Sequence, residues 1–308
     1  MVMTPHINSR FGVFYMCLKS LKKGGKRMIL LNRGFMERDD AIVDIEDRGY
    51  QFGDGVYELI RVYDGVCFEM EGHVQRLKLS SLKIELALPY PLEDIARNLK
   101  QLVEKNGLLN GYIYVQITRG VAQRVHHFPG SVSSVLVAYV QHAERPVEIT
   151  KHGIHAILTE DIRWKRCDIK SLNLLPNVLA KQLAKKHGCD EAIMHRGSTV
   201  SEGSSTNVYI VERNVIYTHP INNLILNGIT RIGVLQMARE NGFRVVEEAF
   251  TVNELLETDE VFVTSTAFEI CPVIQIDQTV IGSGQPGLVT RSLQQAFEHR
   301  IAFNSGIN

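Results

Sequence analysis

The sequence of 308 residues lacks net charge, because 34 basic side chains balance 34 acidic ones. It therefore has no basic excess of the kind that nucleic acids or anionic membrane surfaces attract, and neither is expected as a partner. It also lacks any apolar run that approaches the length of a membrane span. The length is typical of two domains with a large buried core.

Cysteines are few and scattered. The five stand at positions 17, 67, 167, 189 and 271, an odd number with no C-x-x-C spacing. This pattern argues against a disulfide framework and against a zinc site, and it indicates reduced thiols in a cytoplasm. The neighbouring pairs His126/His127 and His187/Cys189 lack further partners, so no metal is expected.

Residues 1–27 lack the features of a core segment and of a secretory signal. Their apolar patch at 11–18 comes before the basic residues, whereas a signal has its charges first. The segment 23–26, Lys-Gly-Gly-Lys, would be encoded by purine-rich codons that resemble a bacterial ribosome-binding site. We therefore expect Met28 to be the natural start and residues 1–27 to be an extension outside the fold. A short genuine tail is the alternative.

Hydrophobic periodicity predicts an α+β protein with two halves. In the first half we expect strands and turns at 29–34, 59–68 (a hairpin turning at Asp64-Gly65), 112–118 and 135–140, and helices at 73–86 and 92–105. In the second we expect strands at 154–159, 190–194, 206–211, 214–217, 244–248, 260–264 and 273–276, and helices at 176–187, 230–241 and about 287–302. The best linker candidate is 142–146, which gives a small domain at 28–143 and a larger one at 148–308.

One lysine stands among residues that favour burial. Lys170 lies in Cys-Asp-Ile-Lys-Ser-Leu-Asn at 167–173, and its apolar neighbours are Ile162, Trp164, Ile169, Leu172, Leu174 and Leu175. Burial would favour its neutral amine, which is a nucleophile toward aldehydes. Alone, however, the segment is more typical of a lysine that extends along apolar surface to water.

Three segments rich in hydroxyl groups follow. Glu202 precedes Gly203 and a run of small hydroxyl residues, which is typical of a polar pocket wall. Thr230 stands where an apolar-periodic helix is expected to begin, and helix starts bind phosphate. Ser265 and Thr266 come after the apolar segment 261–263. Taken singly, Thr230 is more often a plain N-cap and Ser-Thr pairs more often close turns.

In this order the segments closely resemble the class IV aminotransferases. The resemblance also rests on Arg-Gly-Tyr-Gln-Phe-Gly-Asp-Gly-Val-Tyr-Glu at 48–58 and Ile-Thr-Arg-Gly at 117–120, and it runs from about Ile29 to the C-terminus. It implies a two-domain pyridoxal-phosphate enzyme of fold type IV, with a small N-terminal α/β domain and a larger mixed-sheet, barrel-like domain. Within the family the match is closest to the bacterial D-amino acid aminotransferases.

The resemblance implies roles around pyridoxal 5′-phosphate. Lys170 would hold the cofactor aldehyde and then act as general base and acid. Glu202 would pair with the pyridine nitrogen. The implied phosphate-binding residues are Arg76, Ile229 through its backbone N–H, Thr230 and Thr266, with Ser265 beside them. Without that context Arg76 resembles a helix-surface arginine, and Glu202 an exposed loop acid.

The choice of subfamily depends on Arg124-Val125-His126. The resemblance implies that Arg124 and His126 bind the substrate carboxylate in the site of the neighbouring subunit, together with Tyr57 of that subunit, so a homodimer is expected. Side chains spaced by two on an extended segment point the same way. The alternatives are a solvent-facing basic loop for Arg124 and His126 and a half-buried strand aromatic for Tyr57.

The implied reaction converts D-alanine and 2-oxoglutarate to pyruvate and D-glutamate, which supplies D-amino acids for the cell wall. The alternative enzymes are aminodeoxychorismate lyase and a branched-chain L-amino acid aminotransferase, which lack the Arg-x-His pair as far as the resemblance goes. Two departures from the D-enzyme pattern, Pro176-Asn177 and Ala267-Phe268, bear on side-chain preference more than on the reaction type.

Overall fold

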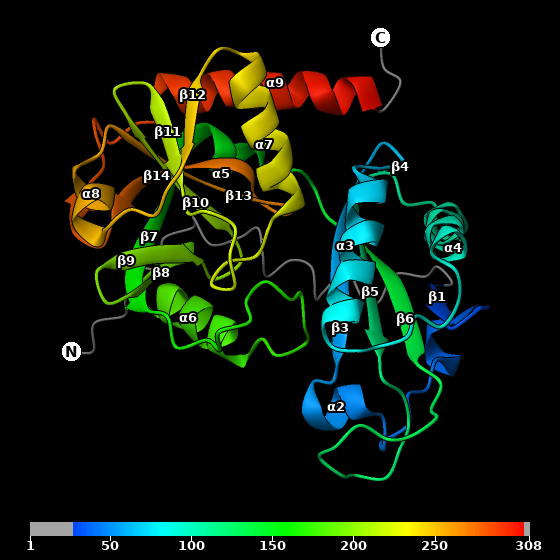
Figure 1. Cartoon of the computed structure of the whole chain (residues 1–308). Coiled ribbons are helices and arrows are strands. Elements are labelled where there is room, and N and C mark those ends of the chain that lie inside the picture. Colours follow the sequence, from blue (N-terminus) through cyan, green and yellow to red (C-terminus); the bar gives the residue numbers. More distant parts are fainter. Residues whose placement is uncertain (1–26, 305–308) are drawn as a thin grey trace, which may run out of the picture.

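The computed structural model describes residues 27–304, which are built on two β-sheets (Figure 1). The predicted extension at 1–27 lies outside the described residues, apart from Arg27. One sheet has six strands from residues 28–142, and the other has nine strands from residues 154–280. The expected α+β architecture is confirmed.

The six-stranded sheet is antiparallel throughout, in the order β2-β1-β6-β5-β3-β4. Its strands are β1 (Met28–Leu31), β2 (Gly34–Glu37), β3 (Gly55–Tyr63), β4 (Val66–Cys67), β5 (Gly111–Thr118) and β6 (Val135–His142). The predicted hairpin turn is confirmed: Asp64 and Gly65 have φ of 47° and 81°, the left-handed values that a tight two-residue turn needs.

Helices α3 (Met70–Lys83) and α4 (Leu92–Asn106) pack on this sheet around a core that includes Leu77, Leu99 and Ile113. Three short elements were not predicted: strand β2, the 3-10 helix η3 (Arg38–Asp40) and α2 (Arg48–Phe52). Five residues are too few for an apolar period. Instead α2 is defined by its ends, because the Asp47 side chain accepts from the Gly49 N–H and Gly53 ends the helix with a left-handed φ of 65°.

The nine-stranded sheet is mixed, in the order β12-β11-β10-β13-β14-β7-β8-β9 with β15 beside β14, and it forms the expected half-barrel. Its strands are β7 (Ile154–Glu160), β8 (Glu191–Arg196), β9 (Thr199–Gly203), β10 (Asn207–Glu212), β11 (Val215–Thr218), β12 (Arg244–Glu247), β13 (Glu260–Ser265), β14 (Glu269–Ile276) and β15 (Thr279–Val280). Strand β14 begins four residues before the predicted start. The difference includes Pro272, which pairs with Phe262 inside the sheet, although proline is uncommon in the interior of a sheet.

Five helices accompany this sheet: α5 (Val147–His152), α6 (Leu175–Lys186), α7 (Ile229–Glu240), α8 (Val252–Glu257) and α9 (Leu288–Asn304). Helices α7 and α9 lie together against it, and α6 packs on β8 (Figure 1). The short α5 and α8 were not predicted, although Thr251 and Glu254 form a capping box that marks the start of α8. None of the described helices is long and apolar enough to cross a membrane.

Candidate active site

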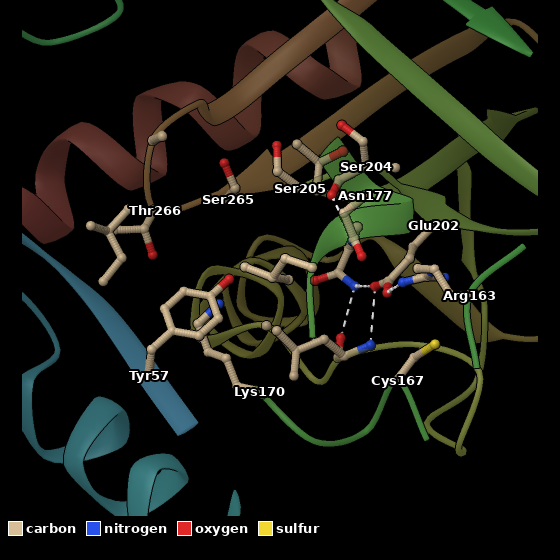
Figure 2. A pocket seen from close by; sticks show the side chains of 18 of the residues that line it. Tyr57, Arg163, Cys167, Lys170, Asn177, Glu202, Ser204, Ser205, Ser265 and Thr266 are labelled. Carbon is tan, nitrogen blue, oxygen red and sulfur yellow. Dashed lines mark hydrogen bonds and ion pairs between the residues drawn. The ribbon is translucent and has the colours of Figure 1, made fainter. Parts of the chain in front are cut away.

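A pocket of about 360 Å³ is lined by residues of both sheets and their loops. This is a typical size for a small-molecule site. Figure 2 shows Lys170 beside Tyr57, and Glu202 beside Arg163 across the pocket. Eight of the ten predicted site residues line it: Tyr57, Arg76, Lys170, Glu202, Ile229, Thr230, Ser265 and Thr266.

Lys170 is placed by strand-like pairing with the start of β3. The Tyr57 N–H donates to the Lys170 carbonyl at 3.0 Å, and the Leu172 N–H donates to Gly55 at 3.0 Å. The Lys170 Nζ lies 4.2 Å from the centroid of the Tyr57 ring. A side chain at Gly55 would collide with the Ile117 carbonyl and Leu172, so this close pairing requires glycine.

The apolar environment expected from the sequence neighbours of Lys170 is only partly correct. Ile169 is buried, but Ile162 and Leu175 are 61% and 68% exposed, and Trp164 is exposed too. These residues lie on a loop and a helix start, where adjacency in sequence does not bring side chains together. The pocket around Lys170 is lined by its sequence neighbours Trp164, Ile169 and Leu174 together with residues of distant segments, such as Tyr57 and Leu59 of β3.

Glu202 is buried and accepts hydrogen bonds from three donors. Its Oε1 accepts from Arg163 at 2.5 Å, and its Oε2 accepts from the Asn207 side chain and the Leu226 N–H, both at 3.0 Å. Burial raises the pKa of the Glu202 carboxyl, while the Arg163 guanidinium opposes the rise. Arg163 is itself held by Asp161, through contacts of 2.8 and 2.9 Å.

Arg163 and Asn207 were missed in the sequence. The signal available for Arg163 was its spacing from Asp161, since alternate residues of an extended segment share one face. For Asn207 no signal existed, because an asparagine after a run of hydroxyl residues is ordinary turn chemistry. The buried Glu191 carboxylate orients the run of hydroxyl residues, because it accepts hydrogen bonds from the hydroxyls of Ser204, Ser205 and Thr206.

The N-terminus of α7 faces the pocket without a side-chain cap. The N-cap is Gly228, so Thr230 is the second helical residue and not a plain N-cap. The first N–H groups of a helix have no partner inside it, and they attract anions. A Cβ at Gly228 would lie 2.3 Å from the Asn207 side chain, so the close approach of these two segments requires glycine.

Arg76 connects α3 to the loop before α7. Its guanidinium binds the two oxygens of Glu58 at 2.6 and 2.8 Å and donates to the Asn227 carbonyl at 3.0 Å. His73 contacts Glu58 at 2.8 Å. Burial by itself would raise the pKa of Glu58, but Arg76 and His73 outweigh it and lower the pKa to about 2. The carboxylate therefore fixes the orientation of Arg76 at the pocket.

We expect the Glu58–Arg76 pair to make folding sensitive to acid. A pKa lowered from 4.5 to about 2 stabilises the folded state above pH 4.5, and this contribution is lost as the pH falls toward 2. Glu58→Gln should destabilise the protein at neutral pH by about 3–5 kcal/mol, because it leaves Arg76 without a counter-charge. Thermal unfolding across this range should show a weaker acid dependence for the variant than for wild type. The exposed Glu93→Gln serves as control, and equal acid dependence in Glu58→Gln and wild type would contradict the assignment.

Arg124 and His126 do not line the pocket of their own chain. Both are exposed on the loop between β5 and β6, beside α2. The Arg124 guanidinium lies 4.7 Å from the centroid of the Phe52 ring, and the His126 ring centroid lies 5.6 Å from it. Their expected place in the site of a neighbouring subunit stays a prediction.

The two departures from the D-enzyme pattern affect the pocket differently. Asn177 lines it, and its side chain donates to the Ser204 carbonyl at 2.9 Å. Ala267 also lines it. Phe268 is absent from the lining, and its ring lies 4.8 Å from the Lys181 ammonium.

Comparison with known proteins identifies the family. The model of the family described as amino-transferase class IV matches residues 55–276. The chain belongs to the class IV aminotransferases. Among sequence relatives of this aminotransferase, the D-alanine aminotransferase of Bacillus licheniformis is 48% identical over 89% of this chain and 96% of its own length. That of Staphylococcus aureus (strain N315) is 49% identical over 90% and 99%.

Solved structures agree with the fold of a class IV aminotransferase. The branched-chain amino acid aminotransferase of Escherichia coli superposes with a TM-score of 0.86 at 28% identity, over 89% of this chain and 94% of that one. A second branched-chain amino acid aminotransferase, solved with pyridoxamine 5′-phosphate, gives a TM-score of 0.84 at 28% identity, over 93% and 96%. The expectation of fold type IV is confirmed.

Proposed function

We propose that this class IV aminotransferase transfers the amino group of D-alanine to 2-oxoglutarate, forming pyruvate and D-glutamate for the cell wall. We infer the reaction class from one observation, namely that Lys170, Glu202 and the uncapped start of α7 line the same pocket. The names of the relatives at 48–49% identity, together with Arg124-Val125-His126, support D-alanine as the substrate.

The pocket residues fit pyridoxal 5′-phosphate at three points. The N–H groups of Ile229 and Thr230, the hydroxyls of Ser265 and Thr266, and Arg76 would hold the phosphate. Glu202 would face the ring nitrogen, and the Lys170 amine would meet the aldehyde. When bound, the cofactor supplies an aldehyde that takes up the amino group and a ring that withdraws electrons from the α-carbon.

Three residues of the chain would have separate roles in the reaction. Lys170 Nζ would act as general base toward the proton on the substrate α-carbon and then as general acid that gives this proton back. Arg163 opposes the rise in pKa that burial causes at Glu202, and the Glu202 carboxylate would hold a proton at the ring nitrogen. The Tyr57 ring beside Lys170 limits where the amine can move and excludes water from that side.

We further propose a homodimer in which Arg124 and His126 complete the site of the partner subunit. Large apolar side chains are exposed close to them in sequence and around α2: Ile42 and Ile45, each 78% exposed, Tyr50 at 80% and Phe128 at 48%. A soluble monomer rarely exposes so much apolar surface in one region. A second copy would cover it and receive the Arg-x-His pair.

The domain boundary and the compartment complete the proposal. We place the boundary at 142–146, between β6 and α5, with a small domain at 28–143 and a large domain at 148–308. We also propose that the enzyme works in the cytoplasm. All four described cysteines, Cys67, Cys167, Cys189 and Cys271, are free thiols, as expected in a reducing compartment.

A coupled assay tests the substrate. D-alanine and L-alanine are each supplied with 2-oxoglutarate, and pyruvate is measured; we expect turnover of D-alanine and very little of L-alanine. A further arm with L-leucine, in which the branched-chain oxo acid formed from leucine is measured, covers the branched-chain alternative, which the superposition with the Escherichia coli enzyme favours. Faster turnover of either L-amino acid would overturn the assignment to D-alanine, but not the reaction class.

A further inference from the structure

Strand β3 presents a third side chain on the face that carries Tyr57 and Leu59. Alternate residues of a strand share a face, so Arg61 follows these two pocket residues. It lines a second, small cavity together with Tyr63, Phe68, His73 and Phe297. Ile229, Thr230, Ser265 and Thr266 line both this cavity and the active-site pocket. These four form a wall between Arg61 and the proposed phosphate position.

The charge of Arg61 is buried without a carboxylate partner. Only 1% of the residue is exposed, and its terminal nitrogens donate to the carbonyls of Ala143 at 3.2 Å and Glu144 at 3.4 Å. Its guanidinium stacks on the rings of Tyr63 and Tyr112, and its Nε has no hydrogen-bond partner. Within residues 27–304 no carboxylate forms an ion pair with it.

Every other buried arginine in the described chain has a carboxylate partner. Arg48 and Arg119 share Asp54, Arg163 pairs with Asp161, and Arg231 pairs with Glu247. A buried charge is costly unless something of opposite sign compensates it. Arg61 instead contacts two carbonyls and two aromatic rings, so an anion bound near it would compensate its charge further.

The proposed phosphate needs such a charge. It carries close to two negative charges, but Arg76 is already neutralised by the ionised Glu58. Burial lowers the pKa of His73, which leaves it neutral, and the start of α7 contributes only about half a charge. The Glu269 carboxylate near Tyr63 pairs with Arg145, which also pairs with Glu298. Among the residues described, Arg61 is the remaining cation on this side of the pocket.

We propose that Arg61 is a positioning residue for the cofactor phosphate. Arg61 acts through the shared wall and through one ordered water, and it keeps the bound phosphate dianionic. The small cavity has a volume of about 10 Å³, close to the room that one water needs. The free Nε–H of Arg61 donates to this water, which passes a hydrogen bond to the hydroxyls of the wall. The proposal rests on the proposed function, because it requires pyridoxal phosphate in the pocket.

Phosphorus NMR of the holoenzyme between about pH 5.5 and 8.5 tests the proposal, since free phosphate monoesters titrate near pH 6. The resonance should stay constant in wild type and in Arg61→Lys, which keeps the charge. In Arg61→Gln it should move with pH as the phosphate takes up a proton. Arg119→Gln removes another buried arginine, one paired with Asp54, and should leave the resonance constant.

Cofactor affinity provides the second readout. Arg61→Gln should weaken binding of pyridoxal phosphate about tenfold while changing that of pyridoxal, which has no phosphate, far less. Arg61→Met replaces Arg61→Gln if the latter does not fold. A constant resonance and an unchanged ratio of the two affinities would overturn the inference. Failure of wild type to bind pyridoxal phosphate at all would instead overturn the proposed function.

Discussion

Lys170→Ala is expected to abolish transamination and the covalent, borohydride-reducible attachment of the cofactor to the chain. Proton transfer alone typically contributes a factor of roughly 10²–10⁴, and loss of the nucleophilic amine adds to this. The pocket lining contains one other lysine, Lys181, but its ammonium donates to the Asp190 carbonyl and lies 3.6 Å from Glu191. No second amine of this lining is therefore available to take over.

Reduction with borohydride followed by peptide mass spectrometry identifies the attached residue. Wild type and the control Lys181→Ala should both carry the cofactor mass on the peptide that contains Lys170, whereas Lys170→Ala should carry none. Noncovalent binding should survive in Lys170→Ala, since Glu202, Arg76 and the start of α7 remain. A reducible attachment in Lys170→Ala would show that another lysine holds the cofactor.

The sequence predicted the residues of this pocket where they belong to contiguous motifs. Lys170, Glu202 and Thr230 each stand in a short segment whose neighbours are distinctive, and the structure brings all three to one pocket. The same holds for the long elements, since α4 and β5 follow clear periods and end at turn residues. The short helices α2, α5 and α8 carry no apolar period, and their caps are the only local signal.

The partners that set charge around the site could not be predicted. Glu58 lies in the motif at 48–58, but its partner Arg76 is 18 residues away in the sequence. Arg163 and its partner Glu202 are separated by 39 residues. Such pairs depend on how distant elements pack within each half of the chain, which no local pattern specifies. The interpretation of Lys170 failed in part for a related reason, because its sequence neighbours Ile162 and Leu175 are exposed and part of its environment comes from β3.

The second large effect concerns the handedness of the substrate. The α-hydrogen must face Lys170, so the position of the carboxylate decides which enantiomer reacts. A charge-assisted hydrogen bond contributes about 1.5–3 kcal/mol, so Arg124→Ala should raise the KM for D-alanine and lower kcat/KM by roughly one to two powers of ten. The neighbouring, exposed His127→Ala should have little effect. Reaction with a simple amine, which has no carboxylate, should also change far less.

Mixed dimers show which subunit supplies Arg124. If the residue acts in the partner's site, a heterodimer of Lys170→Ala and Arg124→Ala chains has one site with both defects and one intact site. Mixing the inactive Lys170→Ala protein with the weakened Arg124→Ala protein under conditions that exchange subunits should then raise the D-alanine activity above that of Arg124→Ala alone. If Arg124 acts within its own chain, each site keeps one defect and the activity does not rise. Heterodimers that demonstrably form but show no such rise would therefore place Arg124 in its own subunit's site, although its side chain does not line that pocket.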